Sequence, residues 1–202
     1  MTRAAATPRR RRRSAATRPV LYTIGHSTRP HDELVRVLQA HGVTTLVDIR
    51  SITRSRANPQ FERTALARAL PRDGIRYVVM PDLGGRRGRS KTADPARNAG
   101  WRVAAFHNYA DYAETPAFQA ALSELLALAG KETCAIMCAE AVWWRCHRRI
   151  VADYALLRGA RVFHLFTPTK AERATRTPFA KLDRRTKTLR YPAAVTPARR
   201  RR

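Results

Sequence analysis

Four side chains that commonly take part in catalysis fall within eleven residues, between Cys138 and Arg148. Cys138 offers a thiol that acts as a nucleophile once it has lost its proton. Glu140 and His147 can serve as general acid and general base. Arg148 can bind a carboxylate or a phosphate group through paired hydrogen bonds. This combination predicts a catalytic site for an anionic substrate.

The residues before and after Cys138 indicate how the fold positions its thiol. The apolar run 133–137 has the length and composition of a buried strand, and we expect a helix to begin near residues 139–141. Cys138 would then lie at the carboxyl end of a strand and beside the amino end of a helix, which stabilises a thiolate. We therefore predict a lowered pKa for Cys138 and faster reaction than for Cys134 or Cys146. A Glu140 carboxylate two residues away opposes this effect.

On such a helix, Glu140 and His147 would lie two turns apart and face one cleft. Non-catalytic explanations stay open for each residue taken alone. A cysteine at the end of a strand is usually a small core residue, and Glu140 could instead cap the helix or pair with Arg148. Several polar groups gathered at one strand end nevertheless favour a functional site.

Polar residues also follow the other apolar segments that we expect to form strands. In a parallel sheet they share the edge that carries Cys138, so we expect Asp48 to join the catalytic residues there. The arginines that follow the strands can bind an anion, and the paired glycines let backbone N–H groups approach it closely. Two alternatives stay open: Asp48 could pair with Arg50, and the glycines could simply form a turn. The predicted substrate-binding residues are His26, Arg50, Ser55, Arg56, Gly84, Gly85, Trp144 and Arg148.

Short apolar segments alternate with segments of helical periodicity along most of the chain. This pattern predicts an α/β fold, a Rossmann-like three-layer sandwich of about five mostly parallel strands covered by helices on both faces. The periodicity ends after Thr167, but we expect the segment 190–192 to dock on the folded body. The expected strands are 20–24, 43–49, 75–80, 133–137 and 161–166, and the other expected helices are 30–41, 61–70, 101–113 and 116–129.

The net charge of +25 in 202 residues is concentrated at the two ends of the chain. Residues 1–19 contain seven arginines and no acid, and residues 170–202 carry a net charge of +10. We expect disordered basic tails at 1–19 and 193–202 around a single domain at 20–169 that extends to about 192. Such tails can bind nucleic acid or another polyanion, although they could also serve solubility alone.

The three cysteines indicate no disulfide framework, and a reducing cytoplasmic location fits best. We expect no membrane span, no signal peptide and no cofactor. A metal site built from Cys138, Cys146 and His147 is disfavoured. Adjacent residues of a helix rarely aim at one ion, and a fourth ligand is not apparent.

Several segments together resemble the DUF488 family of bacterial and archaeal proteins of unknown function. The resemblance covers about Val20 to Pro192, and Thr53 departs from it because the family often has Pro there. It implies an α/β fold with a shared site, but no reaction. The matching segments are Thr23-Ile-Gly-His-Ser-Thr28, Val47-Asp-Ile-Arg50, Arg54-Ser-Arg56 with Asn58-Pro59, Leu83-Gly-Gly-Arg-Arg87, Tyr109-Ala-Asp-Tyr112, Met137-Cys-Ala-Glu140 and Cys146-His-Arg148.

Two functions are compatible with these features. The first is an enzyme that acts on an anionic substrate, with a nucleotide or nucleic acid as one possibility. The second is a nucleic-acid-binding module without catalysis, in which the tails hold phosphates and Trp143 or Trp144 stacks on a base. A thiol phosphatase is disfavoured because it needs an arginine six residues after its cysteine, and Arg145 lies one residue too far. A rhodanese-like loop is disfavoured because the segment after Cys138 contains bulky tryptophans.

Overall fold

The computed structural model describes residues 18–194. The terminal segments that the sequence predicts to be disordered, 1–19 and 193–202, lie almost entirely outside this range. Within it, no helix combines the length and the apolar character needed to cross a bilayer.

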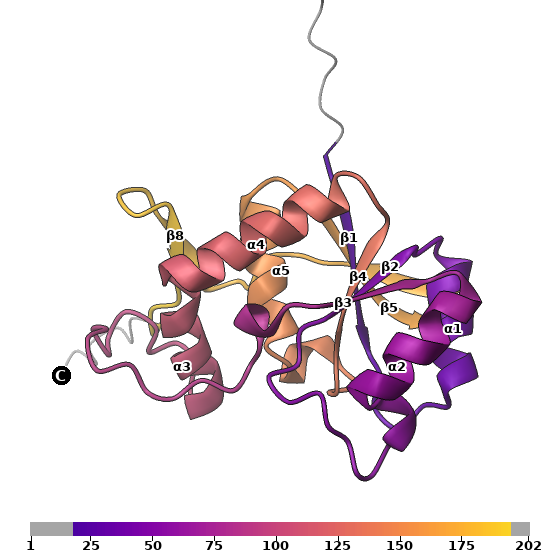
Figure 1. The fold of residues 1–202 in the computed structure, drawn as a ribbon. Coiled ribbons are helices and arrows are strands. Elements are labelled where there is room, and N and C mark those ends of the chain that lie inside the picture. Colours follow the sequence, from indigo (N-terminus) through magenta and orange to yellow (C-terminus); the bar gives the residue numbers. More distant parts are fainter. Residues whose placement is uncertain (1–17, 195–202) are drawn as a thin grey trace, which may run out of the picture.

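A six-stranded sheet forms the centre of the fold (Figure 1). Its first five strands are parallel and lie in the order β3-β2-β4-β1-β5, and β6 pairs with β5 in the antiparallel sense. The predicted α/β fold with a mostly parallel sheet is therefore confirmed. The strands are β1 (Val20–Gly25), β2 (Thr45–Asp48), β3 (Arg76–Val79), β4 (Cys134–Cys138), β5 (Arg161–Thr167) and β6 (Lys170–Arg173).

Helices cover both faces of this sheet, with α1 and α2 on one side and α4 and α5 on the other (Figure 1). β4 is apolar throughout because Cys134 and Ile136 pack into one core while Ala135 and Met137 pack into the other. The helices are α1 (His31–Ala40), α2 (Arg63–Ala69), α3 (Ala104–Ala113), α4 (Pro116–Ala129) and α5 (Arg148–Leu157), together with the short 3-10 helices η1 (Pro59–Phe61), η2 (Leu70–Asp73), η3 (Pro81–Leu83) and η4 (Trp143–Arg145).

The neighbouring strands β1 and β4 send the chain to opposite faces of the sheet. β1 leads into α1, which packs on one face, and β4 leads toward α5, which packs on the other. Such a divergence opens a crevice at the carboxyl ends of the two strands, where open α/β sheets bind their ligands. His26 follows β1 and Cys138 ends β4, so both residues lie at this point.

The segment after β4 corrects one expectation from the sequence. No helix begins at residues 139–141, and α5 begins only at Arg148. The Arg148 guanidinium donates hydrogen bonds to the carbonyl oxygens of Glu140 at 2.6 Å and Ala141 at 3.4 Å. An early helix would need these carbonyls for its own hydrogen bonds. Glu140 and His147 therefore do not share a helix face.

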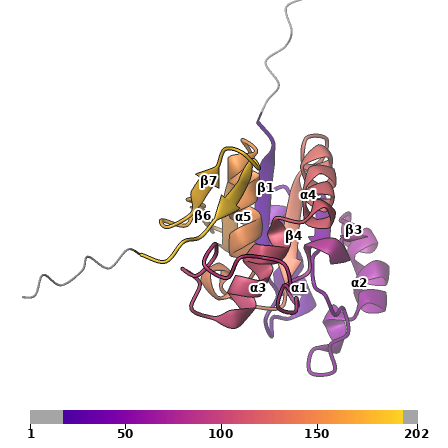
Figure 2. The ribbon, with the colours of Figure 1, turned by 90° about the vertical axis from the view of Figure 1, so that its left-hand side faces the viewer.

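The chain after Thr167 contains structure that the sequence did not predict. β6 adds an edge strand, and β7 (Lys181–Asp183) and β8 (Thr188–Arg190) form a separate hairpin. Figure 2 shows this hairpin, in yellow, beside α5, where the Tyr154 hydroxyl donates to the Leu189 carbonyl. Tyr191 is fully buried, and its hydroxyl donates to Asp153 at 3.0 Å. The expected docking of residues 190–192 is thus confirmed for Tyr191.

Candidate functional site

Strand pairing continues past the ends of the strands and brings three loops together at the carboxyl edge. The His26 N–H donates to the Cys138 carbonyl at 3.0 Å, and the Ile49 N–H donates to the Met137 carbonyl at 3.1 Å. The segments after β1, β2 and β4 therefore lie side by side. Asp48 and Cys138 are on the same edge of the sheet, as the sequence predicts.

A pocket of about 420 Å³ opens at this edge. Its floor includes Cys138, Cys146 and His147, and Glu140 is its one acidic residue. Three of its arginines, at positions 54, 86 and 145, are exposed, and their side chains make no hydrogen bond or ion pair with any residue in 18–194. The complete lining is Arg50, Ser51, Ile52, Arg54, Gly85, Arg86, Val103, Ala105, Phe106, Cys138, Ala139, Glu140, Arg145, Cys146 and His147.

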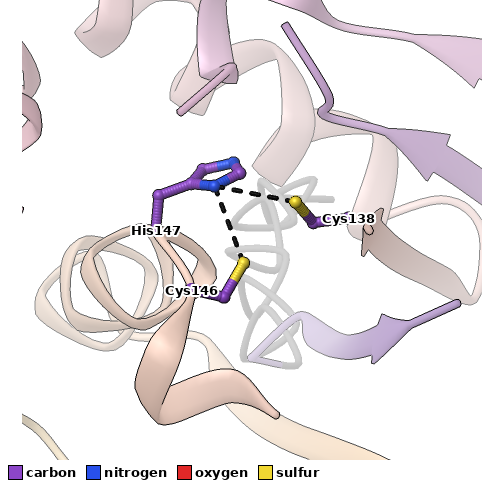
Figure 3. Close-up of side chains that lie close together, drawn as sticks. All are labelled: Cys138, Cys146 and His147. Carbon is purple, nitrogen blue, oxygen red and sulfur yellow. Dashed lines mark hydrogen bonds between the residues drawn. The ribbon is translucent and has the colours of Figure 1, made fainter. Parts of the chain in front are cut away.

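Two sulfurs and one imidazole form a compact group on the pocket floor, which we call the Cys–Cys–His cluster (Cys138, Cys146 and His147). His147 Nδ1 lies 3.8 Å from Cys138 Sγ and 3.6 Å from Cys146 Sγ. Figure 3 shows both sulfurs directed at the same ring nitrogen. Cys146 has extended backbone and His147 precedes α5, so the two adjacent residues are not held at helical spacing. Adjacent residues of a helix rarely aim at one ion, but these two residues are not in a helix, so both side chains can face the same point.

The two cluster thiols have pKa values that move in opposite directions. The hydrogen bond to Cys146, followed by burial, raises the pKa of Cys138. Burial alone would raise the pKa of Cys146, but its contacts with Cys138 and His147 and the charge of Arg148 hold it well below its usual range. The prediction of a lowered pKa at Cys138 is therefore wrong. Arg148 Nε–H donates to the Cys146 sulfur, which favours deprotonation of Cys146 over that of Cys138.

Arg148 lies under the cluster rather than in the pocket. It is 1% exposed, and its Nε–H donates to Cys146 Sγ at 3.3 Å. Its terminal nitrogen holds the Glu140 carbonyl. A Cβ atom at Gly25 would lie 1.9 Å from the Glu140 carbonyl oxygen and 2.8 Å from this Arg148 nitrogen, so only glycine permits the approach of β1. Arg148 therefore positions the loop and polarises Cys146 from below.

The His147 ring is held on several sides. Its Nε2–H donates to the Ile49 carbonyl at 3.3 Å, since a carbonyl oxygen can only accept. Tyr109 packs edge-on against the ring, with the centroids 5.0 Å apart. A Cβ atom at Gly85 would lie 2.4 Å from His147 Nδ1, so the absence of a side chain there gives the ring its space. These contacts direct Nδ1 toward the two sulfurs.

Asp48 and Arg50 form a buried ion pair beside the cluster. Asp48 accepts hydrogen bonds from Arg50 Nε, from a terminal nitrogen of Arg50 at 2.6 Å and from the Tyr77 hydroxyl at 2.6 Å. The exposed fractions are 0% for Asp48 and 3% for Arg50. The other terminal nitrogen of Arg50 lies 3.2 Å from His26 Nε2. Asp48 is saturated within this network and orients Arg50, which reaches the pocket.

His26 and Ser55 line a second, smaller pocket of about 260 Å³ next to the first, and Arg50 and Arg54 contribute to both pockets. Burial lowers the pKa of His26 to about 4, so this ring is neutral at physiological pH. The ring stacks on Phe61 with centroids 4.1 Å apart. His26 therefore offers a neutral polar group rather than a charge.

The remaining predicted residues are placed differently from one another. Glu140 lines the main pocket and is exposed, and Gly85 lines it against His147. Gly84 is buried against Ser51 outside either lining. Arg56 is exposed and also lies outside both linings. Trp144 is 46% exposed and packs edge-on against Trp143 rather than facing the main pocket.

Sequence reasoning did not select several residues that build the site. The sequence gives Cys146 no role beyond that of a disfavoured metal ligand, although its position directly before His147 is a signal for one. The Tyr77 hydroxyl donates to Asp48 from a neighbouring strand, Arg86 approaches the pocket from a loop, and Arg145 approaches it from η4. No local sequence pattern indicates such approaches, because they depend on strand order and loop paths.

Comparison with known proteins identifies the family of this chain. No curated protein and no solved structure shows a significant match to the chain. A model of the domain of unknown function DUF488 matches residues 30–155, which is more than half of the chain. The matched range spans α1 to α5 and includes the whole Cys–Cys–His cluster. The chain therefore belongs to the DUF488 family.

Proposed function

We propose that this protein is an enzyme that acts on an anionic substrate in the main pocket. The proposal depends on one observation: a polarised thiol–imidazole cluster on the pocket floor lies below three arginines whose side chains have no hydrogen-bond or ion-pair partner among residues 18–194. Guanidinium groups without an acidic partner attract carboxylates and phosphates. The Cys–Cys–His cluster lies below these arginines, so it would contact the part of the substrate next to the negatively charged group.

The residues have distinct roles in this proposal. The Cys–Cys–His cluster is the reactive centre, and Glu140 at the pocket wall donates or accepts a proton. Arg54, Arg86 and Arg145 bind the anionic group. Arg148 and the Asp48–Arg50 pair are positioning residues, because their polar atoms are engaged with the protein.

Alkylation kinetics test whether the reactive centre is reached through an anion-selective pocket. Iodoacetate is negatively charged and iodoacetamide is neutral, while both alkylate thiolates. Full-length reduced protein in a chelator is treated with each reagent, and peptide mapping gives the rate at each cysteine. We expect the iodoacetate-to-iodoacetamide rate ratio at the cluster cysteines to exceed that of a small free thiol by on the order of 10-fold, because a basic cleft concentrates anions.

Two double variants of equal charge provide the matched comparison. Arg86→Gln with Arg145→Gln should lower the ratio several-fold. Arg68→Gln with Arg72→Gln removes two exposed arginines from the region of α2 and η2 and should leave it unchanged. A wild-type ratio no higher than that of the free thiol, or equal effects of the two double variants, would contradict the proposal. Once an anionic substrate is found, its turnover should be lost with Cys146→Ser and kept with Cys134→Ser.

A second proposed function is nucleic-acid binding, either with or without catalysis. Trp144 is 46% exposed beside the exposed Arg145, and an exposed indole next to a guanidinium suits base stacking with phosphate contact. Trp144→Ala should then weaken binding of single-stranded DNA. Equal binding by wild type and variant would remove the support that Trp144 lends to this function.

A further inference from the structure

The Cys–Cys–His cluster has the donor atoms of a transition-metal site. Its two sulfurs and one ring nitrogen lie within 4.8 Å of one another. Thiolate and imidazole together favour Zn²⁺ over hard cations such as Mg²⁺ or Ca²⁺. These three groups come from two segments of the chain, the end of β4 and the turn before α5, which the fold brings together.

The distances agree with tetrahedral coordination. With Zn–S bonds of about 2.3 Å and Zn–N bonds of about 2.0–2.1 Å, a tetrahedral ion separates a sulfur and a nitrogen ligand by roughly 3.6 Å. The observed separations from His147 Nδ1 are 3.6 Å to Cys146 Sγ and 3.8 Å to Cys138 Sγ. Both sulfur–nitrogen pairs are thus spaced for one common ion, and the two sulfurs lie within 4.8 Å of each other.

The surroundings supply an independent argument for a metal. His147 donates its Nε2–H to the Ile49 carbonyl, so in the neutral ring the lone pair on Nδ1 faces the two sulfurs. Histidines that bind metals commonly use their second nitrogen in this way. Arg148 donates to Cys146 Sγ, as outer contacts do for a metal-bound thiolate. Gly85 and Tyr109 confine the ring in this orientation.

We infer that Cys138, Cys146 and His147 bind one Zn²⁺ ion and leave its fourth position open toward the main pocket. All three ligands line that pocket, which is where a water or substrate oxygen would complete the tetrahedron. Three protein ligands with one open position are typical of catalytic rather than structural zinc. This inference rests on the proposed function for the use of the open position, but the binding of the ion can be measured without a substrate.

Cobalt titration tests the site directly. Full-length protein is reduced, freed of metal by a chelator and dialysed, and Co²⁺ is then added under inert gas. We expect one equivalent of Co²⁺ to produce thiolate-to-metal charge-transfer absorption and the intense visible bands of tetrahedral Co²⁺. Zn²⁺ should abolish both signals and protect Cys138 and Cys146 from alkylation.

Single substitutions identify the ligands. Cys138→Ser, Cys146→Ser and His147→Gln should each lower Co²⁺ affinity by more than about 100-fold, beyond the usual effect of losing an outer contact. Cys134→Ser is the matched control, since Cys134 lies in the same strand as Cys138 but outside the cluster, and it should keep the spectrum. Circular dichroism of each metal-free variant establishes that it is folded.

Several results would overturn the inference. These are a folded wild type without the cobalt spectrum, a spectrum that survives Cys146→Ser, or oxidation to a Cys138–Cys146 disulfide in place of metal binding. The proposed function is tested separately, because the alkylation ratio is measured on metal-free protein. An anion-selective pocket without cobalt binding would therefore refute the zinc site alone.

Discussion

Replacement of Asp48 by Asn should strongly destabilise the protein, because it leaves a buried cation without its counter-charge. Asp48 is 0% exposed and receives hydrogen bonds from Arg50 and from the Tyr77 hydroxyl. Breaking a buried ion pair by removing one partner costs about 3–5 kcal/mol. For a protein of this size, that loss corresponds to a fall in Tm of roughly 6–20 °C.

Urea unfolding of wild type and Asp48→Asn gives the change in unfolding free energy, and thermal unfolding gives the shift in Tm. Asp32→Asn is a matched control, because Asp32 pairs with Arg36 on the surface with 67% of its side chain exposed. This control should change stability by less than about 1 kcal/mol. The double variant Asp48→Asn/Arg50→Met should recover part of the loss, since it removes the unpaired cation as well.

A loss of stability in Asp48→Asn no greater than that in Asp32→Asn would refute this prediction, because Arg50 would then have found another partner or reached solvent through the pocket. A double variant less stable than Asp48→Asn alone would also refute it, because the buried charge would then not be the cause of the loss; the contacts of Arg50 with other groups, such as the Phe61 carbonyl, would matter more.

Three further predictions concern other parts of the molecule. Gly85→Ala should displace the His147 imidazole and lower cobalt affinity at least about 10-fold. Gly88→Ala is the control, because its Cβ would lie in open space, and it should leave the affinity unchanged. Equal affinities of the two variants would show that a side chain at position 85 does not displace the imidazole. Burial lowers the pKa of His164 to about 3, below the 6.5 of the unfolded chain, so its contribution to stability is present above pH 6.5 and is lost as pH falls. Between pH 7 and pH 5 the unfolding free energy of the wild type should therefore fall by about 2 kcal/mol because of this ring. In His164→Gln, measured by urea unfolding at both pH values, the fall should be smaller by this amount. An equal fall in wild type and variant would show that the His164 ring is already protonated in the folded state. Deletion of residues 1–17 and 195–202 should reduce the salt dependence of DNA binding, and an unchanged slope would place the phosphate contacts on the folded body.

The strands and most helices could be predicted because their signals are local. The buried strand β4 is apolar on both faces, which marks it in the sequence whatever its neighbours are. The common position of Asp48 and Cys138 at one edge of the sheet could also be predicted, because the carboxyl ends of parallel strands lie at the same edge. The edge strand β6 and the hairpin β7–β8 were missed because these strands are only three or four residues long and each contains a single apolar residue, which is too little to form a pattern.

The chemistry of the site depended on contacts between distant segments. The sequence alone indicated that Cys138 and His147 lie at the carboxyl edge of the sheet. Tertiary structure decided that Arg148 holds the Glu140 and Ala141 carbonyls and delays α5, which leaves Cys146 free to face Cys138. It also decided that the pKa is lowered at Cys146 and raised at Cys138, because a thiol pKa follows the groups around the sulfur, and those groups meet only after the chain has folded.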